Sequence, residues 1–229
     1  MNIVILTGAG ISAESGLGTF RDAGGLWTRY PLEEVATPDG FARNPDLVHE
    51  FYNERRRLCR EAAPNAAHDA LARLDRAWKG GLLIVTQNVD DLHERAGARR
   101  LLHMHGELLM RLCAACGGRA PAEGDLSTGL PCPECGAAAL RPDVVWFGEI
   151  PYHMEEIGAA LGRADLFVSI GTSGEVYPAA GFAFEAARAG ARTLELNLEA
   201  SGGRFDEARE GPASRLVPAW VEEILAAQS

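Results

Sequence analysis

Three short apolar runs divide the chain and predict buried β-strands, over residues 2–7, 82–86 and 166–170. Residues 193–199 predict a further strand, with polar residues at its end. An uninterrupted apolar run of about five residues is typical of a strand that is covered on both faces, as in a parallel sheet. Polar residues with small side chains follow each run, so each strand is expected to end in a loop at one edge of that sheet.

Helical periodicity fills the intervals between these runs. The longest example, residues 44–63, places Leu47, Phe51, Leu58 and Cys59 near the helical period after a start at Asn44-Pro45-Asp46. The other predicted helices cover residues 66–77, 92–97, 153–163, 179–189 and 218–227. Strands that alternate with helices predict an α/β fold, a doubly wound parallel sheet of the Rossmann-like kind with right-handed crossovers.

The loops after the strands carry the candidate chemistry. Gly8-x-Gly10-x-x-Ala13 follows the first strand directly and fits a glycine-rich dinucleotide fingerprint, which is a weak signal alone. A dehydrogenase would next show a strand ending in an acidic residue, but residues 18–27 are too rich in glycine for one. Hydride transfer is therefore disfavoured, and Phe20 and Arg21 are expected on a loop that could fold over a nucleotide.

Four of the five cysteines predict a structural zinc site. Cys113-x-x-Cys116 and Cys132-x-x-Cys135 are separated by fifteen residues. Each pair offers two thiolates to one Zn²⁺, and four thiolates leave no open position for catalysis. We expect a small zinc-ribbon module over residues 108–141 and a helical insert over residues 24–66, within a single domain of residues 1–229.

His105 is the candidate for proton transfer, since an imidazole titrates near neutral pH. It follows the 82–86 strand and the polar loop Gln87-Asn88-Val89-Asp90. His68, His93 and His103 are interpreted as structural.

The composition and net charge of the chain disfavour some classes of binding partner. The 229 residues are 47% hydrophobic and 24% charged, with a net charge of −10. Such a charge disfavours nucleic acid and anionic membranes as partners, because both require a basic surface. The chain opens without a basic leader or a long apolar segment, so a cytoplasmic protein is expected.

The ordered set of motifs resembles the sirtuins, the NAD-dependent protein deacylases. The matching motifs are Gly8-Ala9-Gly10-Ile11-Ser12 with Gly16 and Thr19-Phe20-Arg21, Thr86-Gln87-Asn88-Val89-Asp90, His105-Gly106, the four cysteines, Val145-Trp146-Phe147-Gly148-Glu149, Gly171-Thr172-Ser173 and Asn197-Leu198-Glu199. The resemblance implies that NAD is the co-substrate, that zinc is structural and that acylated lysine side chains of proteins are the partners. It also implies that His105 is the catalytic base and that the products are nicotinamide, free lysine and O-acyl-ADP-ribose.

The resemblance also assigns the binding residues. The NAD contacts that it implies are Gly8, Ala9, Gly10, Ile11, Ser12, Ala13, Glu14, Gly16, Thr19, Phe20, Arg21, Trp27, Gln87, Asn88, Val89, Asp90, Gly171, Thr172, Ser173, Asn197, Leu198, Glu199 and Ala213. Tyr52-x-x-Arg55 resembles the signature of sirtuins that remove succinyl and malonyl groups, because an arginine fork and a phenol can bind a carboxylate. Val145, Phe147 and Gly148 are expected to offer a strand edge to the substrate backbone.

Two alternatives from other classes stay open on the sequence. His105-x-Glu107 with Pro131-Cys132-x-x-Cys135 also satisfies the pattern of a zinc-dependent deaminase, which would need His105 on the metal. The second alternative is a non-catalytic zinc-ribbon binding module, which would apply if the glycine loops are ordinary turns.

Overall fold

A six-stranded parallel sheet forms the larger lobe. The computed structural model describes residues 1–18 and 29–228. The strand order is β3-β2-β1-β7-β8-β9, which is the 3-2-1-4-5-6 order of a Rossmann fold. The strands are β1 (Ile3–Thr7), β2 (Leu82–Thr86), β3 (Leu101–His103), β7 (Leu166–Ile170), β8 (Arg192–Asn197) and β9 (Glu207–Glu210).

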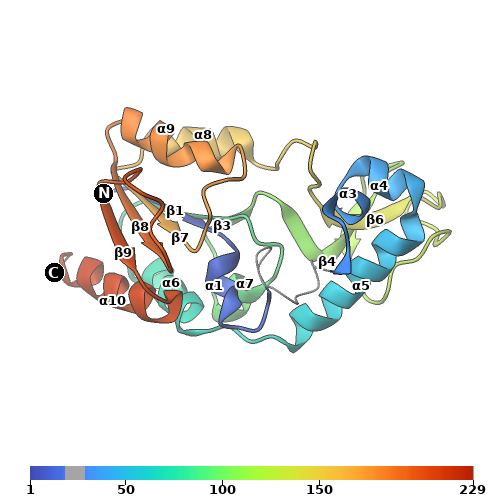
Figure 1. Cartoon of the computed structure of the whole chain (residues 1–229), viewed down its shortest axis with the longest axis horizontal. Coiled ribbons are helices and arrows are strands. Elements are labelled where there is room, and N and C mark those ends of the chain that lie inside the picture. Colours follow the sequence, from blue (N-terminus) through green and yellow to red (C-terminus); the bar gives the residue numbers. More distant parts are fainter. Residues whose placement is uncertain (19–28, 229) are drawn as a thin grey trace.

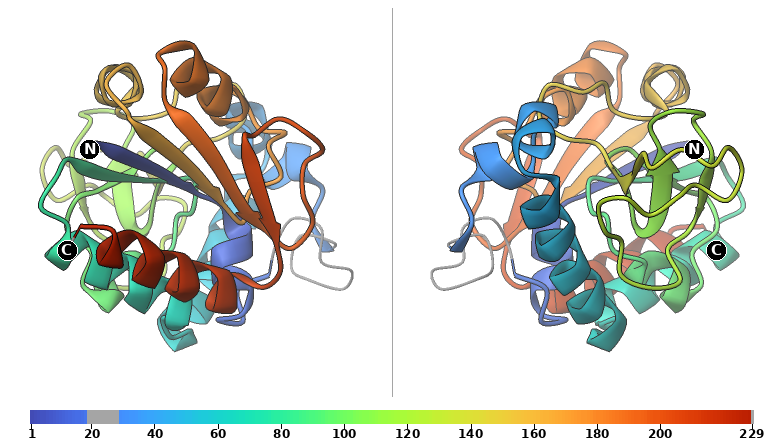
Figure 2. Two further views of the ribbon diagram at one scale, coloured as in Figure 1. Left: turned by 90° about the vertical axis from the view of Figure 1, so that its left-hand side faces the viewer. Right: turned by 90° about the vertical axis from the view of Figure 1, so that its right-hand side faces the viewer.

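Helices cover both faces of this sheet, and the apolar runs show why (Figures 1 and 2). In β1, Ile3 and Ile5 join the apolar layer under α6 (Ala66–Ala77) and α10 (Ala213–Ala226). Val4 and Leu6 point to the opposite layer, with α8 (Met154–Leu161) and α9 (Phe182–Arg188). Because side chains alternate along a strand, a strand covered on both faces must be apolar at every position.

Among the described residues, the smaller lobe contains an antiparallel sheet in the order β5-β4-β6 and the helices α3, α4 and α5 (Figure 1). Its elements are α3 (Leu32–Val35), α4 (Pro38–Arg43), α5 (Pro45–Glu61), β4 (Gly106–Cys113), β5 (Arg119–Pro121) and β6 (Leu140–Val144). An aromatic cluster that includes Phe51, Tyr52 and Trp146 joins α5 to this sheet. The other elements of the described residues are two short helices, α1 (Ala9–Ala13) and α7 (Leu92–Ala96), and the 3₁₀ helix η1 (Ala179–Gly181).

The structure corrects the expected elements at the C-terminal end. The last helix begins at Ala213, five residues before the predicted start at Pro218, and Pro218 lies inside it. Ala213 is therefore the first residue of a helix and not part of a loop. The predicted strand over residues 193–199 ends at Asn197, and the edge strand β9 had no prediction.

No helix in the described part of the chain is both long enough and apolar enough to cross a membrane.

Candidate active site

The carboxyl ends of β1 and β7 meet where the strand order reverses, the position at which open α/β sheets bind ligands. The loops after these two strands touch through their backbones. A Cβ on Gly10 would lie 2.7 Å from Cα of Gly171, and one on Gly8 would lie 2.8 Å from Cβ of Thr172. Gly171 has a φ of 58°. Glycine is therefore required at Gly10 and Gly171 by this close approach, and the first N–H groups of α1 face the same edge.

Asn88 and Asp90 are fixed to α1 through Ser12. The Asn88 Nδ2 amide donates to the carbonyl oxygen of Gly8 and to Ser12 Oγ, each at 3.1 Å. The Ser12 hydroxyl donates to Asp90 Oδ2 at 3.0 Å. All three side chains are buried, and burial raises the pKa of the Asp90 carboxyl. The loop after β2 is thus held against the glycine-rich loop.

Two further hydrogen bonds bring the ends of β7 and β8 to the same place. The Gln87 Nε2 amide donates to Thr172 Oγ1 at 2.9 Å. Asn197 Nδ2 donates to the carbonyl oxygen of Thr172 at 3.0 Å. Gln87, Asn88, Asp90, Thr172 and Asn197, which the sequence assigned to one ligand, therefore lie in one connected set.

Other residues expected to contact NAD have different surroundings. Ile11 and Val89 bury their side chains in the apolar clusters of the two lobes. The Glu14 carboxylate accepts hydrogen bonds from the backbone N–H and hydroxyl of Ser214, at the start of α10. Ala9 and Gly171 are half-buried, Ala213 is buried, and the others are exposed, namely Ala13, Gly16, Ser173, Leu198 and Glu199. Thr19, Phe20, Arg21 and Trp27 lie outside the described residues.

His105 extends from the turn between β3 and β4, and its ring is anchored on one side. Its Nδ1 lies 3.0 Å from the carbonyl oxygen of Gln87. A carbonyl only accepts, so Nδ1 carries the proton and Nε2 keeps its lone pair. Burial lowers the pKa of His105, although the Gln87 contact opposes this shift. Gly106 follows with a φ of 81°, and a Cβ there would collide with the carbonyl oxygen of Asp143, so the histidine must be followed by glycine.

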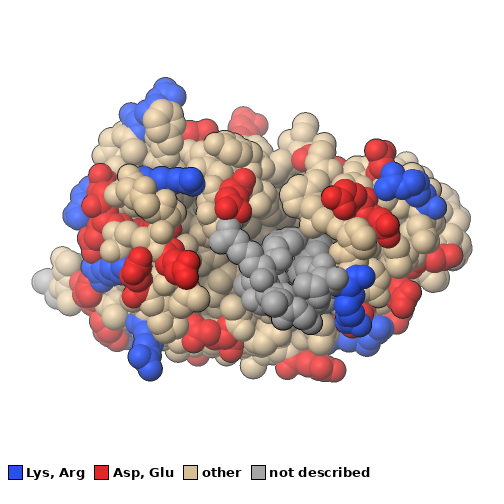
Figure 3. Space-filling model, viewed as in Figure 1, with Lys and Arg blue, Asp and Glu red and all other residues tan. Residues whose placement is uncertain are grey.

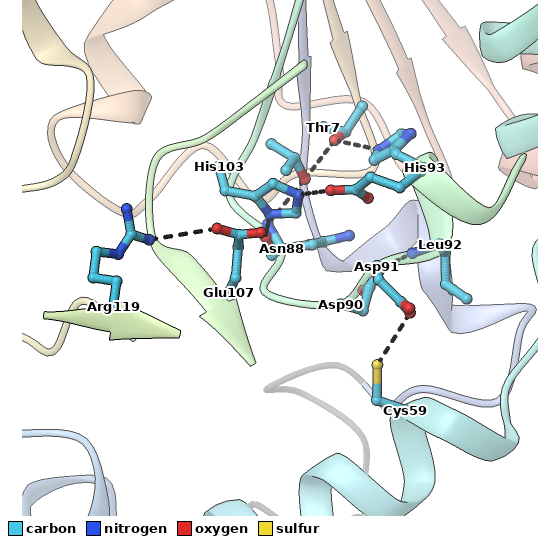
Figure 4. Close-up of polar contacts among 12 residues, drawn as sticks. Thr7, Cys59, Asn88, Asp90, Asp91, Leu92, His93, His103, Glu107 and Arg119 are labelled. Atoms are coloured by element: carbon cyan, nitrogen blue, oxygen red, sulfur yellow. Dashed lines mark hydrogen bonds and ion pairs between the residues drawn. The ribbon is translucent and has the colours of Figure 1, made fainter. Parts of the chain in front are cut away.

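The remaining histidines near the site have structural partners, as predicted. His68 caps α6, accepting the Asn65 N–H at Nδ1. His93 contacts the Thr7 hydroxyl at 3.0 Å, a contact drawn in Figure 4. His103 places Nδ1 3.0 Å from the carbonyl oxygen of Asn88 (Figure 4).

His103 also belongs to a charged cluster. Its Nε2 lies 2.6 Å from Glu94 Oε1, and the Glu107 carboxylate lies within 4.8 Å of both groups. Burial lowers the pKa of His103, but the Glu94 hydrogen bond and charge outweigh burial and raise it overall. Arg119 contacts Glu107 at 3.4 Å (Figure 4). Arg119 also pairs with the buried Asp143 carboxylate at 2.5 Å, so three carboxylates, one guanidinium and the His103 imidazole form one network.

The four cysteines converge as the spacing predicted. Sγ of Cys113 lies 3.7 Å from Sγ of Cys135, and Sγ of Cys116 lies 3.9 Å from Sγ of Cys132. Four thiolates arranged tetrahedrally at a Zn–S distance of about 2.3 Å would be about 3.8 Å apart. The cluster therefore fits one zinc ion. Its members are Cys113, Cys116, Cys132 and Cys135, and among the described groups His105 is not with them, which contradicts the deaminase alternative.

Tyr52 and Arg55 share one face of α5, and the tyrosine is less accessible than the sequence suggested. Tyr52 is 1% exposed, and its hydroxyl oxygen accepts the indole N–H of Trp146 at 3.0 Å. Arg55 is half-buried, and its guanidinium lies over the Tyr52 ring, 5.4 Å from the centroid. Burial raises the pKa of Tyr52 and lowers that of Arg55. One turn further along α5, Cys59 contacts Asp91 Oδ1 at 3.6 Å, so this helix lies beside the loop that follows β2.

The expected strand edge at Val145, Phe147 and Gly148 is partly occupied by the protein itself. The Val145 N–H donates to the carbonyl oxygen of His105 at 2.9 Å, and the Phe147 N–H donates to that of Ala36 at 3.0 Å. The Phe147 side chain is 45% exposed, and Gly148 is exposed. An added strand must therefore pair with other backbone groups of this segment.

Sequence reasoning missed an ion pair that holds this segment. Arg141 Nη1 and Nη2 donate to Glu149 Oε1 and Oε2 at 2.6 and 2.9 Å. The guanidinium also stacks on Trp146, 3.5 Å from the ring centroid. Arg141 and Glu149 are eight residues apart on opposite sides of an irregular segment, so no periodic signal connects them.

The face of the molecule drawn in Figure 3 carries mixed charges. Basic and acidic side chains are interspersed over its described residues, without a continuous basic area.

Comparison with known proteins decides the family. The family model described as the Sir2 family matches residues 8–178. The chain belongs to the Sir2 family. It is 59% identical over 232 residues to an NAD-dependent protein deacylase of Caulobacter vibrioides, covering 99% of this chain and 98% of the relative. It is 55% identical over 228 residues to one of Salmonella typhimurium, covering 97% and 84%.

Solved Sir2 structures share the fold. A Sir2 homologue in complex with NAD matches with a TM-score of 0.91 and 38% identity, covering all of this chain and 91% of the other. A Sir2 protein bound to an acetylated peptide matches with a TM-score of 0.84 and 29% identity, covering 97% and 92%. The Rossmann-like sheet and the cysteine module predicted from the sequence are thus those of the Sir2 fold.

Proposed function

We propose that the protein is an NAD-dependent protein-lysine deacylase that removes acetyl groups and also succinyl and malonyl groups. Its relatives are named as deacylases, and Sir2 structures of the same fold hold NAD or an acetylated peptide. The observation that carries the proposal is the convergence of His105, Asn88 and Asp90 at the reversal of strand order. The helix that carries Arg55 contacts the same loop, through Cys59 and Asp91.

The chain's own residues would bind and orient the reactants. The glycine-rich loop would hold the pyrophosphate, and Asn88 and Asp90 would hold the nicotinamide end of the co-substrate. NAD supplies an electrophilic ribose carbon and nicotinamide as its leaving group. The products would be nicotinamide, free lysine and O-acyl-ADP-ribose. Fixing two reactants in attack geometry supplies much of the rate for a weak nucleophile such as an amide oxygen.

His105 would act as a general base at its Nε2. The Gln87 carbonyl holds the proton on Nδ1, so Nε2 is ready to accept the proton of a ribose hydroxyl. Burial keeps the free imidazole neutral near pH 7, because it lowers the pKa of His105. The base is therefore in its active protonation state before substrate arrives.

Arg55 would select acyl groups that end in a carboxylate. A guanidinium binds a carboxylate through two parallel N–H bonds, and the Tyr52 hydroxyl adds a third donor. Burial makes such contacts stronger than they would be in water. An acetyl group offers no negative charge to these donors. They therefore strengthen the binding of succinyl and malonyl substrates only.

The test compares one peptide carrying either a succinyl-lysine or an acetyl-lysine, with NAD, and follows both products by mass spectrometry. Arg55→Met is expected to lower kcat/KM for the succinyl peptide at least about tenfold more than for the acetyl peptide. Arg57→Met is the matched control, since Arg57 lies on the same helix but is exposed and paired with Asp125. Equal losses on the two peptides would reject the carboxylate site, and an absence of nicotinamide release from wild type would reject the deacylase.

A further inference from the structure

The buried contact between Trp146 and Tyr52 determines where the Tyr52 hydroxyl proton can point. A tyrosine hydroxyl has one proton to donate and an oxygen that accepts. An indole N–H donates only, so the 3.0 Å contact from Trp146 Nε1 occupies the Tyr52 oxygen as an acceptor. The Arg55 guanidinium lies over the Tyr52 ring, 5.4 Å from its centroid, and it likewise has no acceptor.

We infer that Trp146 is a specificity-determining residue, which, by donating its indole N–H to Tyr52, leaves the tyrosine proton for an acceptor on the acyl group. Neither Trp146 nor Arg55 can accept that proton. A carboxylate at the end of a succinyl or malonyl chain is an acceptor of the right chemistry, whereas the methyl group of an acetyl chain is not. The inference rests on the proposed function and deepens it.

The position of Trp146 is itself fixed by several contacts. Its ring is 2% exposed and stacks under the Arg141 guanidinium, and its backbone N–H donates to Glu149 Oε2 at 2.8 Å. Glu149 in turn holds both Nη atoms of Arg141. Burial would raise the pKa of Glu149, but the Arg141 hydrogen bonds lower it, so the pair stays charged. The Arg141–Glu149 pair is therefore a brace for the indole, and the indole orients Tyr52.

The same segment also carries the exposed Phe147 and Gly148, so loss of Trp146 can disturb peptide binding in general. The measurement must therefore be the ratio of kcat/KM values for a succinyl and an acetyl form of one peptide sequence. Contacts with the peptide backbone are common to both forms and cancel in this ratio. A purely structural role for Trp146 would change melting temperature and both rates but would leave the ratio in place.

A double-mutant cycle tests the inference. Trp146→Phe removes the N–H and keeps an aromatic ring, and we expect the succinyl-to-acetyl ratio to fall about tenfold, the size expected for a weakened hydrogen bond to a charged group. In a Tyr52→Phe background, Trp146→Phe should change the ratio by less than about twofold, because the hydroxyl through which it acts is gone. Phe41→Leu is the packing control, since Phe41 contacts the Trp146 ring at a centroid distance of 5.1 Å and should leave the ratio unchanged.

The outcomes are distinct. If the ratio is unchanged in Trp146→Phe, or falls equally in the two backgrounds, the inference is overturned while the deacylase proposal stands. If Tyr52→Phe and Arg55→Met both leave the ratio unchanged, the carboxylate site fails and the inference fails with it. A Trp146→Phe protein too unstable to assay would be replaced by Glu149→Gln, which loosens the brace and should lower the ratio in the same direction.

Discussion

The imidazole Nδ1 of His105 lies 3.0 Å from the carbonyl oxygen of Gln87, and this contact joins the candidate base to the loop after β2. Because Asn88 and Asp90 follow directly in that loop, the tautomer of His105 and the positions of both side chains depend on one backbone segment. A displacement of the loop would therefore disturb the base and the binding residues together.

Replacing His105 by alanine should abolish most turnover. Removal of a general base costs about 10²- to 10⁴-fold in rate, so kcat for nicotinamide release on an acetylated peptide should fall by at least about a hundredfold. The melting temperature should change little, because the ring is only half-buried. A variant that keeps wild-type turnover would remove His105 from the mechanism.

The acid limb of the pH–rate profile should reflect the lowered pKa of His105. Burial lowers the pKa of His105 below its ordinary 6.5, and the base works in its neutral form. Activity is therefore expected to rise with pH through a value below 6.5 and to be level by about pH 7. The measurement is kcat/KM between about pH 5 and 8, and an acid limb centred above 6.5 would contradict the assignment.

Stability should fall in mild acid because His68 is buried in its neutral form. Burial lowers its pKa to about 4 in the folded state, against 6.5 in the unfolded chain. Between these values the unfolded chain binds more protons, so the free energy of unfolding decreases as the pH falls. His68 alone should account for roughly 2 kcal/mol between about pH 7.5 and 5.

Urea unfolding at the two pH values would measure this effect. His68→Asn should lower stability overall but weaken the pH dependence, since the buried imidazole is gone. His153→Asn is the control, because His153 is exposed and its φ of 61° suits asparagine. An unchanged pH dependence in His68→Asn would show that other groups cause the loss.

Removal of zinc should unfold the cysteine module. The module has a small apolar cluster of its own, so the metal supplies much of its folding free energy. Cys116→Ser, or treatment with a strong chelator, should lower the melting temperature by about 10 °C or more. Metal analysis should give one zinc per chain for wild type and for Cys59→Ala, whose buried thiol lies outside the cluster. Zinc retained at full stoichiometry in Cys116→Ser would be inconsistent with a four-thiolate site.

Gly10→Ala should weaken NAD binding and destabilise the fold. The added methyl group would lie 2.7 Å from Cα of Gly171, and backbone atoms on both sides must move. The expected cost is about 1–3 kcal/mol of stability, together with at least about a tenfold increase in the Kd for NAD by calorimetry. Gly124→Ala is the matched control, because a Cβ there meets no atom within 4 Å. Equal affinities in the two variants would mean that the loop contact does not shape the site.

Much of the larger lobe follows from its apolar runs. The runs that gave β1, β2 and β7 are apolar because helices cover both faces, which leaves a strong local signal. The strand β9 carries Glu207, Ala208, Arg209 and Glu210 and has no such signal. It forms because the edge of β8 offers backbone partners, and that information is not in its own residues. Pro218 concealed the start of α10, because proline usually marks the first turn of a helix.

At the candidate site, too, the sequence predicted local features but not contacts between distant residues. The cysteine spacing predicted the cluster because each pair is local. Tyr52 and Arg55 could be placed on one helix face by their spacing, but the partner of Tyr52 could not be found. Trp146 is 94 residues away, and only the packing of α5 against the smaller sheet brings it to the hydroxyl.

The described part of the smaller lobe comes from two separate stretches, residues 32–61 and 106–144, so the chain passes between the lobes several times. In the described residues these passages are the segments 62–65, 104–105 and 145–153. Any opening or closing of the lobes must bend all of these connections together, which favours a small rotation about a broad hinge. A protease that cuts one of them would leave the two halves tethered, so a nicked enzyme should still migrate as one particle in native gels.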